Sequence, residues 1–161
     1  MRPGNLSPQP TLELRIPPVA LTIACAVAMV VVARCVPAAH LEVPARVPLA
    51  VLLAVVGIAV ALAGVASFRR HETTMNPLAP DRSSALVVSG IYRYSRNPMY
   101  LGFLLLLASA GAFLSNAASA LMLPAFVAYM NRFQIAPEER ALREKFSAEF
   151  AAYAASVRRW L

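Results

Sequence analysis

The chain of 161 residues is 59% hydrophobic and only 14% charged, with a mean hydropathy of +0.61. Soluble domains are about 45–50% apolar and about 25% charged, and a soluble fold this small leaves too much surface exposed to hide so many apolar side chains. The same figures exclude a disordered chain, and two cysteines are too few for a disulfide scaffold. The composition therefore indicates an all-α integral membrane protein.

The net charge of +7 could suggest a nucleic-acid partner. The basic residues, however, border the apolar runs and form no separate basic domain. This placement suits anionic lipid headgroups, so we expect membrane lipids and no nucleic acid as partners. We expect no metal site either, because the two histidines are far apart and no Cys–His cluster occurs.

The first two apolar runs predict transmembrane helices. A polar tail over residues 1–15 precedes runs at 16–36 and 47–68, and each run is long enough to cross a bilayer. The second run contains no charge, and it carries a small-residue face suited to close helix packing (Gly57, Ala61 and Gly64).

Two shorter apolar runs, 99–114 and 117–130, follow a polar stretch over residues 69–98. The break between them is only Ser115 and Asn116, so they predict a helical hairpin and bring the number of spans to about four. Pro124 lies inside the second arm, where it should kink the helix.

The segment 137–161 is different in character, because its large apolar residues recur at spacings of three and four. This periodicity predicts an amphipathic helix on the cytoplasmic surface or over the bundle. The stripe consists of Leu142, Phe146, Phe150, Tyr153, Val157 and Trp160. We therefore expect three regions: the tail (1–15), the first two transmembrane helices (16–68) and a functional region (69–161).

Four spans place the tail, the 69–98 stretch and all residues after 130 on one side of the membrane. These parts hold 2, 5 and 6 Lys and Arg residues, 13 in all, whereas the other side holds Arg46, with Arg34 at a helix end. Because Lys and Arg concentrate in cytoplasmic loops, both termini are expected in the cytoplasm.

Two polar segments flank the hairpin and should meet on that cytoplasmic face. The first covers residues 89–102, and the second covers residues 132–140, which include the pair Glu138 and Glu139. Other interpretations of these residues remain open. The glutamates follow Pro137 and could serve only the dipole of a first helical turn, arginines could be membrane anchors, and Gly102 could be a helix contact.

The order and spacing of these residues resemble the isoprenylcysteine carboxyl methyltransferase and phospholipid methyltransferase superfamily of integral membrane enzymes, over residues 68–161. Its Arg-His-Pro-x-Tyr-x-Gly hallmark is matched by Arg96, Pro98, Tyr100 and Gly102, with Asn97 in place of His. Its second hallmark, Glu-Glu, Leu and then Phe-Gly-x-x-Tyr-x-x-Tyr, begins at Glu138. Ser147 replaces the Gly and Phe150 replaces the first Tyr of that pattern. The Asn form is similar to the bacterial branch, which implies a bacterial inner membrane.

This resemblance implies S-adenosylmethionine as methyl donor, S-adenosylhomocysteine as product, and a lipophilic acceptor that enters from the bilayer. The implied cofactor-binding residues are Arg96, Asn97, Pro98, Tyr100, Gly102, Glu138 and Glu139. The glutamates would pair the cofactor's ammonium, and Arg96 or backbone donors would hold its carboxylate. The implied catalytic residues are Arg132, which would hold an acceptor carboxylate or phosphate, and Glu139, which would take a proton from an amine or thiol.

The leading interpretation of function is thus a carboxyl O-methyltransferase of the isoprenylcysteine type. A phospholipid or other lipid N-methyltransferase is the alternative. A sterol-reductase-like enzyme using NADPH, or a membrane protein without enzymatic activity, ranks below both.

Overall fold

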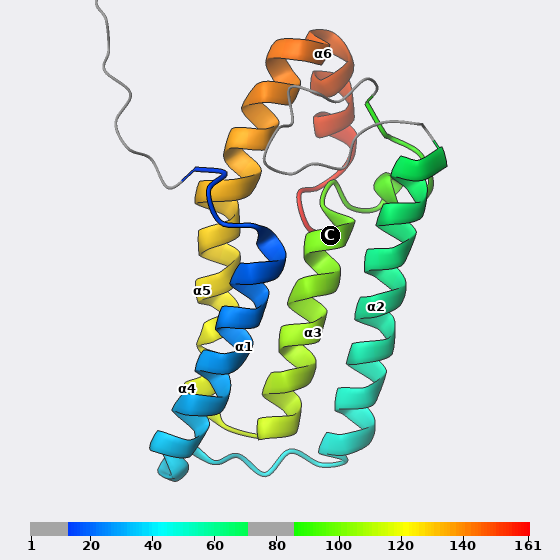
Figure 1. The fold of residues 1–161 in the computed structure, drawn as a ribbon. Helices are drawn as coiled ribbons and strands as arrows, with labels where there is room; N and C mark the ends of the chain where they lie inside the picture. Colours follow the sequence, from blue (N-terminus) through cyan, green and yellow to red (C-terminus); the bar gives the residue numbers. More distant parts are fainter. Residues whose placement is uncertain (1–12, 71–85) are drawn as a thin grey trace, which may run out of the picture.

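The computed structural model describes residues 13–70 and 86–161, and no strand occurs in these ranges (Figure 1). The predicted tail therefore lies outside the described residues except for its last three. The elements in chain order are α1 (Pro18–Cys35), the 3₁₀ turn η1 (Pro37–Ala39), α2 (Arg46–Arg70), the 3₁₀ turn η3 (Gly90–Arg93), α3 (Pro98–Leu114), α4 (Ala117–Ala120), α5 (Met122–Tyr129), the π-helix η4 (Met130–Ile135) and α6 (Ala136–Ser156).

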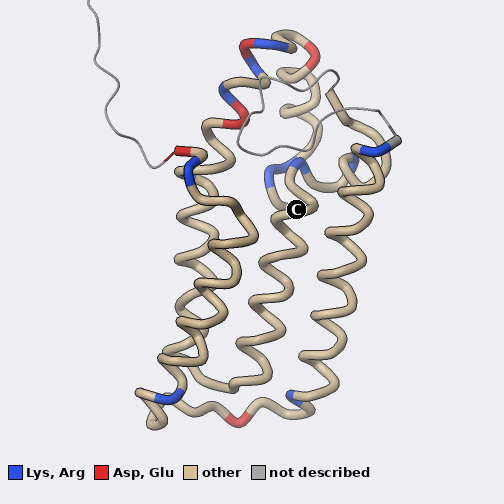
Figure 2. Tube along the Cα trace, in the orientation of Figure 1, with Lys and Arg blue, Asp and Glu red and all other residues tan. Residues whose placement is uncertain are grey.

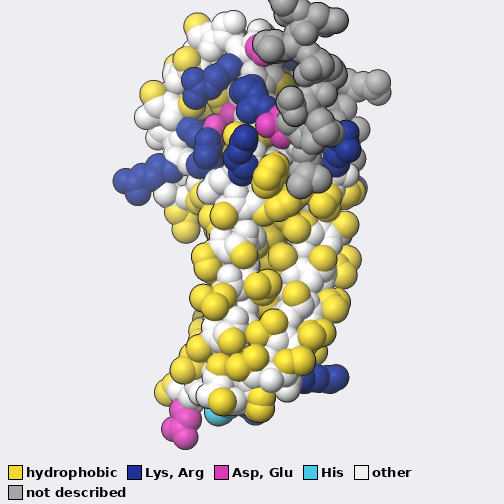
Figure 3. All heavy atoms as spheres, turned by 90° about the vertical axis from the view of Figure 1, so that its left-hand side faces the viewer, with side chains coloured by type: hydrophobic (Ala, Val, Ile, Leu, Met, Phe, Trp, Pro, Cys, Tyr) yellow, Lys and Arg dark blue, Asp and Glu magenta, His cyan; other side chains and the backbone are white. Residues whose placement is uncertain are grey.

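Two of these helices are long and apolar enough to cross a membrane, Pro18–Cys35 and Arg46–Arg69, with mean hydropathies of 2.1 and 2.8. α3 is apolar but has only 17 residues. Figure 3 shows hydrophobic side chains along the helices on one face of the molecule. Many large hydrophobic side chains on α1 and α2 face outward, among them Val19, Ile23, Val51, Val55 and Leu62. An apolar exterior of this extent is typical of a membrane protein.

The charged side chains gather at the two ends of the bundle, and most of them lie at one end (Figure 2). That end holds the starts of α1 and α3, the end of α2 and all of α6 (Figure 1). The opposite end carries only Arg34, Glu42 and Arg46 among the described charged residues. The first described residues, before α1, and the C-terminal segment both lie at the more highly charged end.

α3 lies at the centre of the bundle, with α2 packed along one side and α1 and α5 on the other (Figure 1). The contact with α2 is close because two glycines face each other. A Cβ placed on Gly102 would lie 2.6 Å from the Gly57 carbonyl oxygen and 2.7 Å from the Ala61 Cβ. On the other side of α3, Met29, Leu107 and other buried residues form the core.

The predicted helical hairpin is present, and its turn is built by Ser115 and Asn116. Ser115 adopts a left-handed conformation with φ 49°, and Asn116 caps α4 by accepting a hydrogen bond from the Ser119 N–H. The returning arm is interrupted, as expected, near Pro124. α4 ends at Ala120, whose carbonyl would be the partner of the N–H that a proline lacks.

The prediction of one amphipathic helix up to Leu161 was wrong. α6 ends at Ser156, and its path changes direction at Ser147, which has φ 35° and ψ −104°. Val157 and Trp160 therefore lie outside the helix, in an extended segment (residues 157–161). This segment returns to the start of α3, where the Arg96 N–H donates to the Arg158 carbonyl over 3.0 Å.

Candidate functional site: a glutamate shared by two arginines

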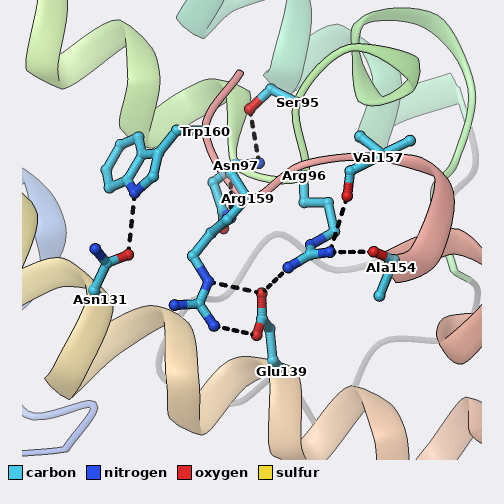
Figure 4. A network of polar contacts seen from close by, with 9 residues as sticks. All are labelled: Ser95, Arg96, Asn97, Asn131, Glu139, Ala154, Val157, Arg159 and Trp160. Atoms are coloured by element: carbon cyan, nitrogen blue, oxygen red, sulfur yellow. Dashed lines mark hydrogen bonds and ion pairs between the residues drawn. The ribbon is translucent and has the colours of Figure 1, made fainter.

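A carboxylate held between two guanidinium groups forms the centre of the charged end (Figure 4). Glu139, in the first turns of α6, is buried. Its Oε1 accepts hydrogen bonds from Arg96 Nη2 at 2.8 Å and from Arg159 Nε at 3.1 Å, and its Oε2 accepts from Arg159 Nη2 at 2.6 Å. The cluster thus contains two positive charges and one negative charge.

Arg96 also holds the end of α6 in place. Its Nη1 donates to the backbone carbonyls of Ala154 at 2.8 Å and Val157 at 2.9 Å. The Ala154 carbonyl belongs to the last turn of α6 and has no partner within the helix itself, and the Val157 carbonyl lies just beyond the end of the helix. Only 13% of the Arg96 side chain is exposed, and its Nε is buried without a hydrogen-bond partner among the described residues.

The segment 157–161 is attached at two further points. Asn97 Nδ2 donates to the Arg159 carbonyl over 2.9 Å, and Trp160 Nε1 donates to Asn131 Oδ1 over 3.0 Å (Figure 4). Asn97 itself precedes α3 and makes no side-chain cap for that helix. Its amide therefore joins the start of α3 to the C-terminal segment.

The two arginines determine the charge state of Glu139. Burial alone would raise the pKa of this carboxyl, but the hydrogen bond from Arg159 and the positive charges of Arg96 and Arg159 outweigh burial and lower the pKa. The pKa of Arg159 is raised in turn by its hydrogen bond to Glu139. Glu139 is an ionised carboxylate at neutral pH and a weak proton acceptor, which argues against the predicted role of Glu139 as a base.

Glu138 lies in a separate network, because neighbouring helical residues point about 100° apart. Its Oε1 accepts hydrogen bonds from the Tyr100 hydroxyl at 2.6 Å and from Gln134 Nε2, whereas its Oε2 accepts none from the described residues. Desolvation raises the pKa of Glu138 to about 7, against the two hydrogen bonds, which act to lower it. Glu138 is thus poised to gain or lose a proton near neutral pH.

The π-helix η4 positions Gln134 for this network. A π-helix has one more residue in each hydrogen-bonded turn than an α-helix and changes the direction of the side chains that follow. Gln134 is buried within η4 and reaches both Glu138 and the Tyr100 hydroxyl. The apolar run 117–130 gave no indication of this distortion, which begins at its last residue.

An open groove of about 630 Å³ is connected to the cluster through Val157. Its wall includes Val157, whose carbonyl is held by Arg96, and Tyr153, whose hydroxyl donates to the Tyr92 carbonyl over 2.7 Å. Most side chains that line the groove are apolar, and one positive and one negative side chain accompany them. The lining residues are Leu86, Val88, Arg93, Glu149, Ala152, Tyr153, Ser156 and Val157.

The remaining predicted residues have other surroundings. Pro98 begins α3 and is fully buried, and Gly102 is the close contact with α2. Arg132 makes no contact with Glu139. Its side chain is 68% exposed, lies 3.5 Å from Glu13 Oε1 and stacks over Phe133. Glu13 also binds Arg140 over 2.6 Å.

Sequence analysis missed Arg159, Gln134 and the bond between Trp160 and Asn131. Arg159 follows another arginine, and its local sequence does not distinguish the two. No group of three or more potential metal ligands occurs among the described residues. The structure thus brings Arg96, Asn97, Tyr100, Glu138 and Glu139 together and leaves Arg132 apart.

The helical bundle and its buried charged cluster define a membrane-type protein with a polar site at one end. The chain matches the phospholipid methyltransferase family over residues 45–149, which is more than half of its length, and it belongs to this family. The resemblance stated from the two hallmark segments is confirmed at this level. An uncharacterized protein of Haemophilus influenzae strain Rd is 43% identical over 63 residues, which cover 39% of this chain and all of that protein. No solved structure matches the chain significantly.

Proposed function

We propose that this protein is an S-adenosylmethionine-dependent methyltransferase of a bacterial inner membrane, acting on a lipophilic acceptor. The cluster of Arg96, Glu139 and Arg159 is the observation that carries this proposal, because it lies at the meeting point of the two family segments. In this arrangement four helical spans place both termini in the cytoplasm, where the cofactor is dissolved, and the acceptor comes from the membrane lipids.

The residues fit the amino-acid end of such a cofactor. That end carries one ammonium and one carboxylate, and the cluster offers one carboxylate and two guanidinium groups, with an unpartnered buried Nε on Arg96. Glu139 would hold the ammonium, while Asn97, Pro98, Tyr100 and Gly102 fix the start of α3 beside it. S-adenosylmethionine, when bound, supplies the methyl group from its sulfonium sulfur.

The acceptor determines which further residue is needed. A carboxylate, as in isoprenylcysteine-type O-methylation, has no proton to lose, and exposed Arg132 would hold such an anion once released from Glu13. An amine or thiol must lose a proton. Glu138 supports this alternative, lipid N-methylation, because its Oε2 is free of hydrogen bonds from the described residues and its pKa is about 7.

Binding to detergent-purified protein tests the cofactor assignment. We expect calorimetry to detect S-adenosylmethionine and S-adenosylhomocysteine and to detect no binding of NADPH. Glu139→Gln should weaken the binding of both by roughly 10- to 100-fold, since a neutral amide cannot pair with the ammonium. Glu144→Gln, an exposed change on the same helix, is the matched control. NADPH binding in place of both ligands would contradict the proposal.

Transfer of a radiolabelled methyl group to extracted lipids tests the acceptor. Label that is released by mild base would identify a methyl ester and carboxyl chemistry. Label that resists base would identify an N- or S-methylated product, and in that case Glu138→Gln should lower the rate with little effect on the affinity for S-adenosylhomocysteine.

A further inference from the structure

The two guanidinium groups at Glu139 differ in how firmly each is held. Arg96 donates to two backbone carbonyls besides Glu139 and is 13% exposed. Among the described residues, Arg159 donates its side-chain hydrogen bonds to Glu139 alone, and its side chain is 36% exposed. If another cation binds Glu139, Arg159 is therefore the partner that gives way, because its displacement breaks no other side-chain hydrogen bond to a described residue.

The backbone of Arg159 is fixed independently of its side chain. Asn97 holds the Arg159 carbonyl, the Arg96 N–H holds the preceding carbonyl, and Trp160 is bonded to Asn131 (Figure 4). The guanidinium can thus turn away from Glu139 while its Cα stays beside the site. A free positive charge then remains next to the carboxylate that has just accepted a new cation.

We propose that the Arg159–Glu139 ion pair is the recognition element for the α-amino acid end of the methyl donor, with Arg159 holding its carboxylate. Accepting this zwitterion replaces the Arg159–Glu139 ion pair by two ion pairs, ammonium to Glu139 and carboxylate to Arg159. The ligand is neutral overall, so the net charge of the cluster does not change. The inference rests on the proposed function and assigns the carboxylate to Arg159, because the guanidinium of Arg96 is already committed to Glu139 and the end of α6.

Four ligands separate the two ends of the zwitterion in a binding assay. S-adenosylhomocysteine carries both charges, 5′-deoxy-5′-(3-aminopropylthio)adenosine keeps only the ammonium, 5′-deoxy-5′-(3-carboxypropylthio)adenosine keeps only the carboxylate, and 5′-methylthioadenosine has neither. The variants are Arg159→Gln and, as matched control, Arg158→Gln, which removes the same charge from an exposed neighbouring side chain.

Arg159→Gln should weaken S-adenosylhomocysteine binding by roughly 10- to 100-fold, the effect of a lost charge-assisted hydrogen bond. The same variant should bind the aminopropyl compound as tightly as wild type or more tightly, because no guanidinium then competes for Glu139. Arg158→Gln should match wild type for all ligands. Arg159→Lys, which keeps the charge, should bind S-adenosylhomocysteine within about tenfold of wild type. If Arg159→Gln does not fold, Arg159→Met, which also removes the charge, replaces it in the comparison.

Equal losses for S-adenosylhomocysteine and the aminopropyl compound, or no loss for either, would overturn the role of Arg159 and leave the cofactor assignment standing. Failure of the wild-type protein to bind S-adenosylhomocysteine would overturn both. Thermal unfolding of each variant in detergent shows whether a loss reflects binding or folding.

Discussion

Glu138 and Glu139 are adjacent in sequence and have opposite electrostatic surroundings. Glu139 has two guanidinium partners, which hold its pKa down, whereas Glu138 has only neutral partners, Tyr100 and Gln134. The folded structure therefore favours the charged form of one carboxyl and the neutral form of the other. Because of this difference, we expect Glu138 to make the stability of the folded protein depend on pH around neutrality.

Wild-type stability relative to Glu138→Gln should fall as the pH rises from about 4.5 to above 7. In this interval the unfolded chain has lost the Glu138 proton while the folded protein, with a pKa of about 7, keeps it. Because the folded state binds more protons in this interval, the contribution of Glu138 to the free energy of unfolding is complete below pH 4.5 and is lost as the pH rises past 7. The loss is on the order of 3 kcal/mol.

Unfolding midpoints of both proteins in detergent between pH 4 and 8 measure this effect. Glu139→Gln is the informative comparison, because the pKa of Glu139 is lowered in the folded state. Its contribution should be present above pH 4.5 and disappear as the pH falls further. Parallel curves for wild type and Glu138→Gln would show that Glu138 is ionised in the folded protein at neutral pH.

Asn97 should be replaceable by histidine and intolerant of leucine. Its amide donates to the Arg159 carbonyl, and an imidazole N–H can take over that bond, whereas leucine has no donor. We expect Asn97→Leu to weaken S-adenosylhomocysteine binding by roughly 3- to 10-fold, with Asn97→His near wild type. Asn97→Asp separates tethering from capping, since a carboxylate can cap α3 but cannot donate. Binding of the Asp variant at wild-type affinity would refute the tether.

The hallmark residues of the site could be recognised from sequence, but their partners could not. Arg96, Asn97 and the two glutamates lie in matched patterns, so their meeting on one face was predictable. The separation of the glutamates depends on the direction of α6 and on the π-turn at Gln134, neither of which changes the apolar periodicity. The position of Arg159 depends on the path of the chain beyond Ser156. The apolar periodicity continues to Trp160 and therefore predicted a helix there, which was wrong.

At the scale of elements, Ser147 explains a feature of the family pattern. The resemblance places a glycine at this position, and the structure gives Ser147 φ 35° and ψ −104°, a region that side chains with a Cβ rarely adopt. The turn at Ser147 brings Phe150 and Tyr153 of α6 against Val87 and Tyr92. This chain thus has the bend in α6 although serine, unlike glycine, is strained at this backbone conformation.

Ser147→Gly should stabilise the protein by about 1 kcal/mol, because glycine relieves the strained φ. Ser147→Ala serves as the control and should not stabilise, since alanine keeps the Cβ. Thermal unfolding in detergent measures both. A stabilising alanine would show that the serine hydroxyl, and not the backbone conformation, is the unfavourable feature.

The contact between α2 and α3 should tolerate no Cβ at Gly102. An added methyl group would lie 2.6 Å from the Gly57 carbonyl oxygen, which is backbone and cannot move without separating the helices. We expect Gly102→Ala to cost about 1–3 kcal/mol of stability. Gly111→Ala, whose Cβ would lie 3.2 Å from the flexible end of Met29, should cost less. Equal losses would mean that the helices separate without penalty.

The elements themselves were largely predictable, since long apolar runs with few charges specify α1, α2 and α3 almost to the residue. The returning arm was less so. Its run was continuous in composition, whereas the structure divides it into α4, α5 and a π-helix. Pro124 indicated the first division through its missing N–H, but no residue type indicates the second.

At the scale of the molecule, the two ends of the bundle should face different compartments. Cys35 is exposed at the end that carries few charges, and Arg158 is exposed at the other. In Cys25→Ser protein, a membrane-impermeant maleimide should label Cys35 in intact spheroplasts. In a variant with both cysteines replaced, Arg158→Cys should react only after permeabilisation. The reverse pattern would invert the topology.

The two arginines that share Glu139 also impose an order on biosynthesis. The ribosome adds Arg96 43 residues before Glu139 and Arg159 20 residues after it. At about 5–20 residues per second, the growing chain carries Arg96 and Glu139 without Arg159 for roughly one to four seconds. The residues made in that interval supply one positive and one negative charge to the future cluster, and the surplus positive charge comes only with Arg159. A chain that stops just before that point therefore contains the sequence of every described helix but lacks the charge that completes the site.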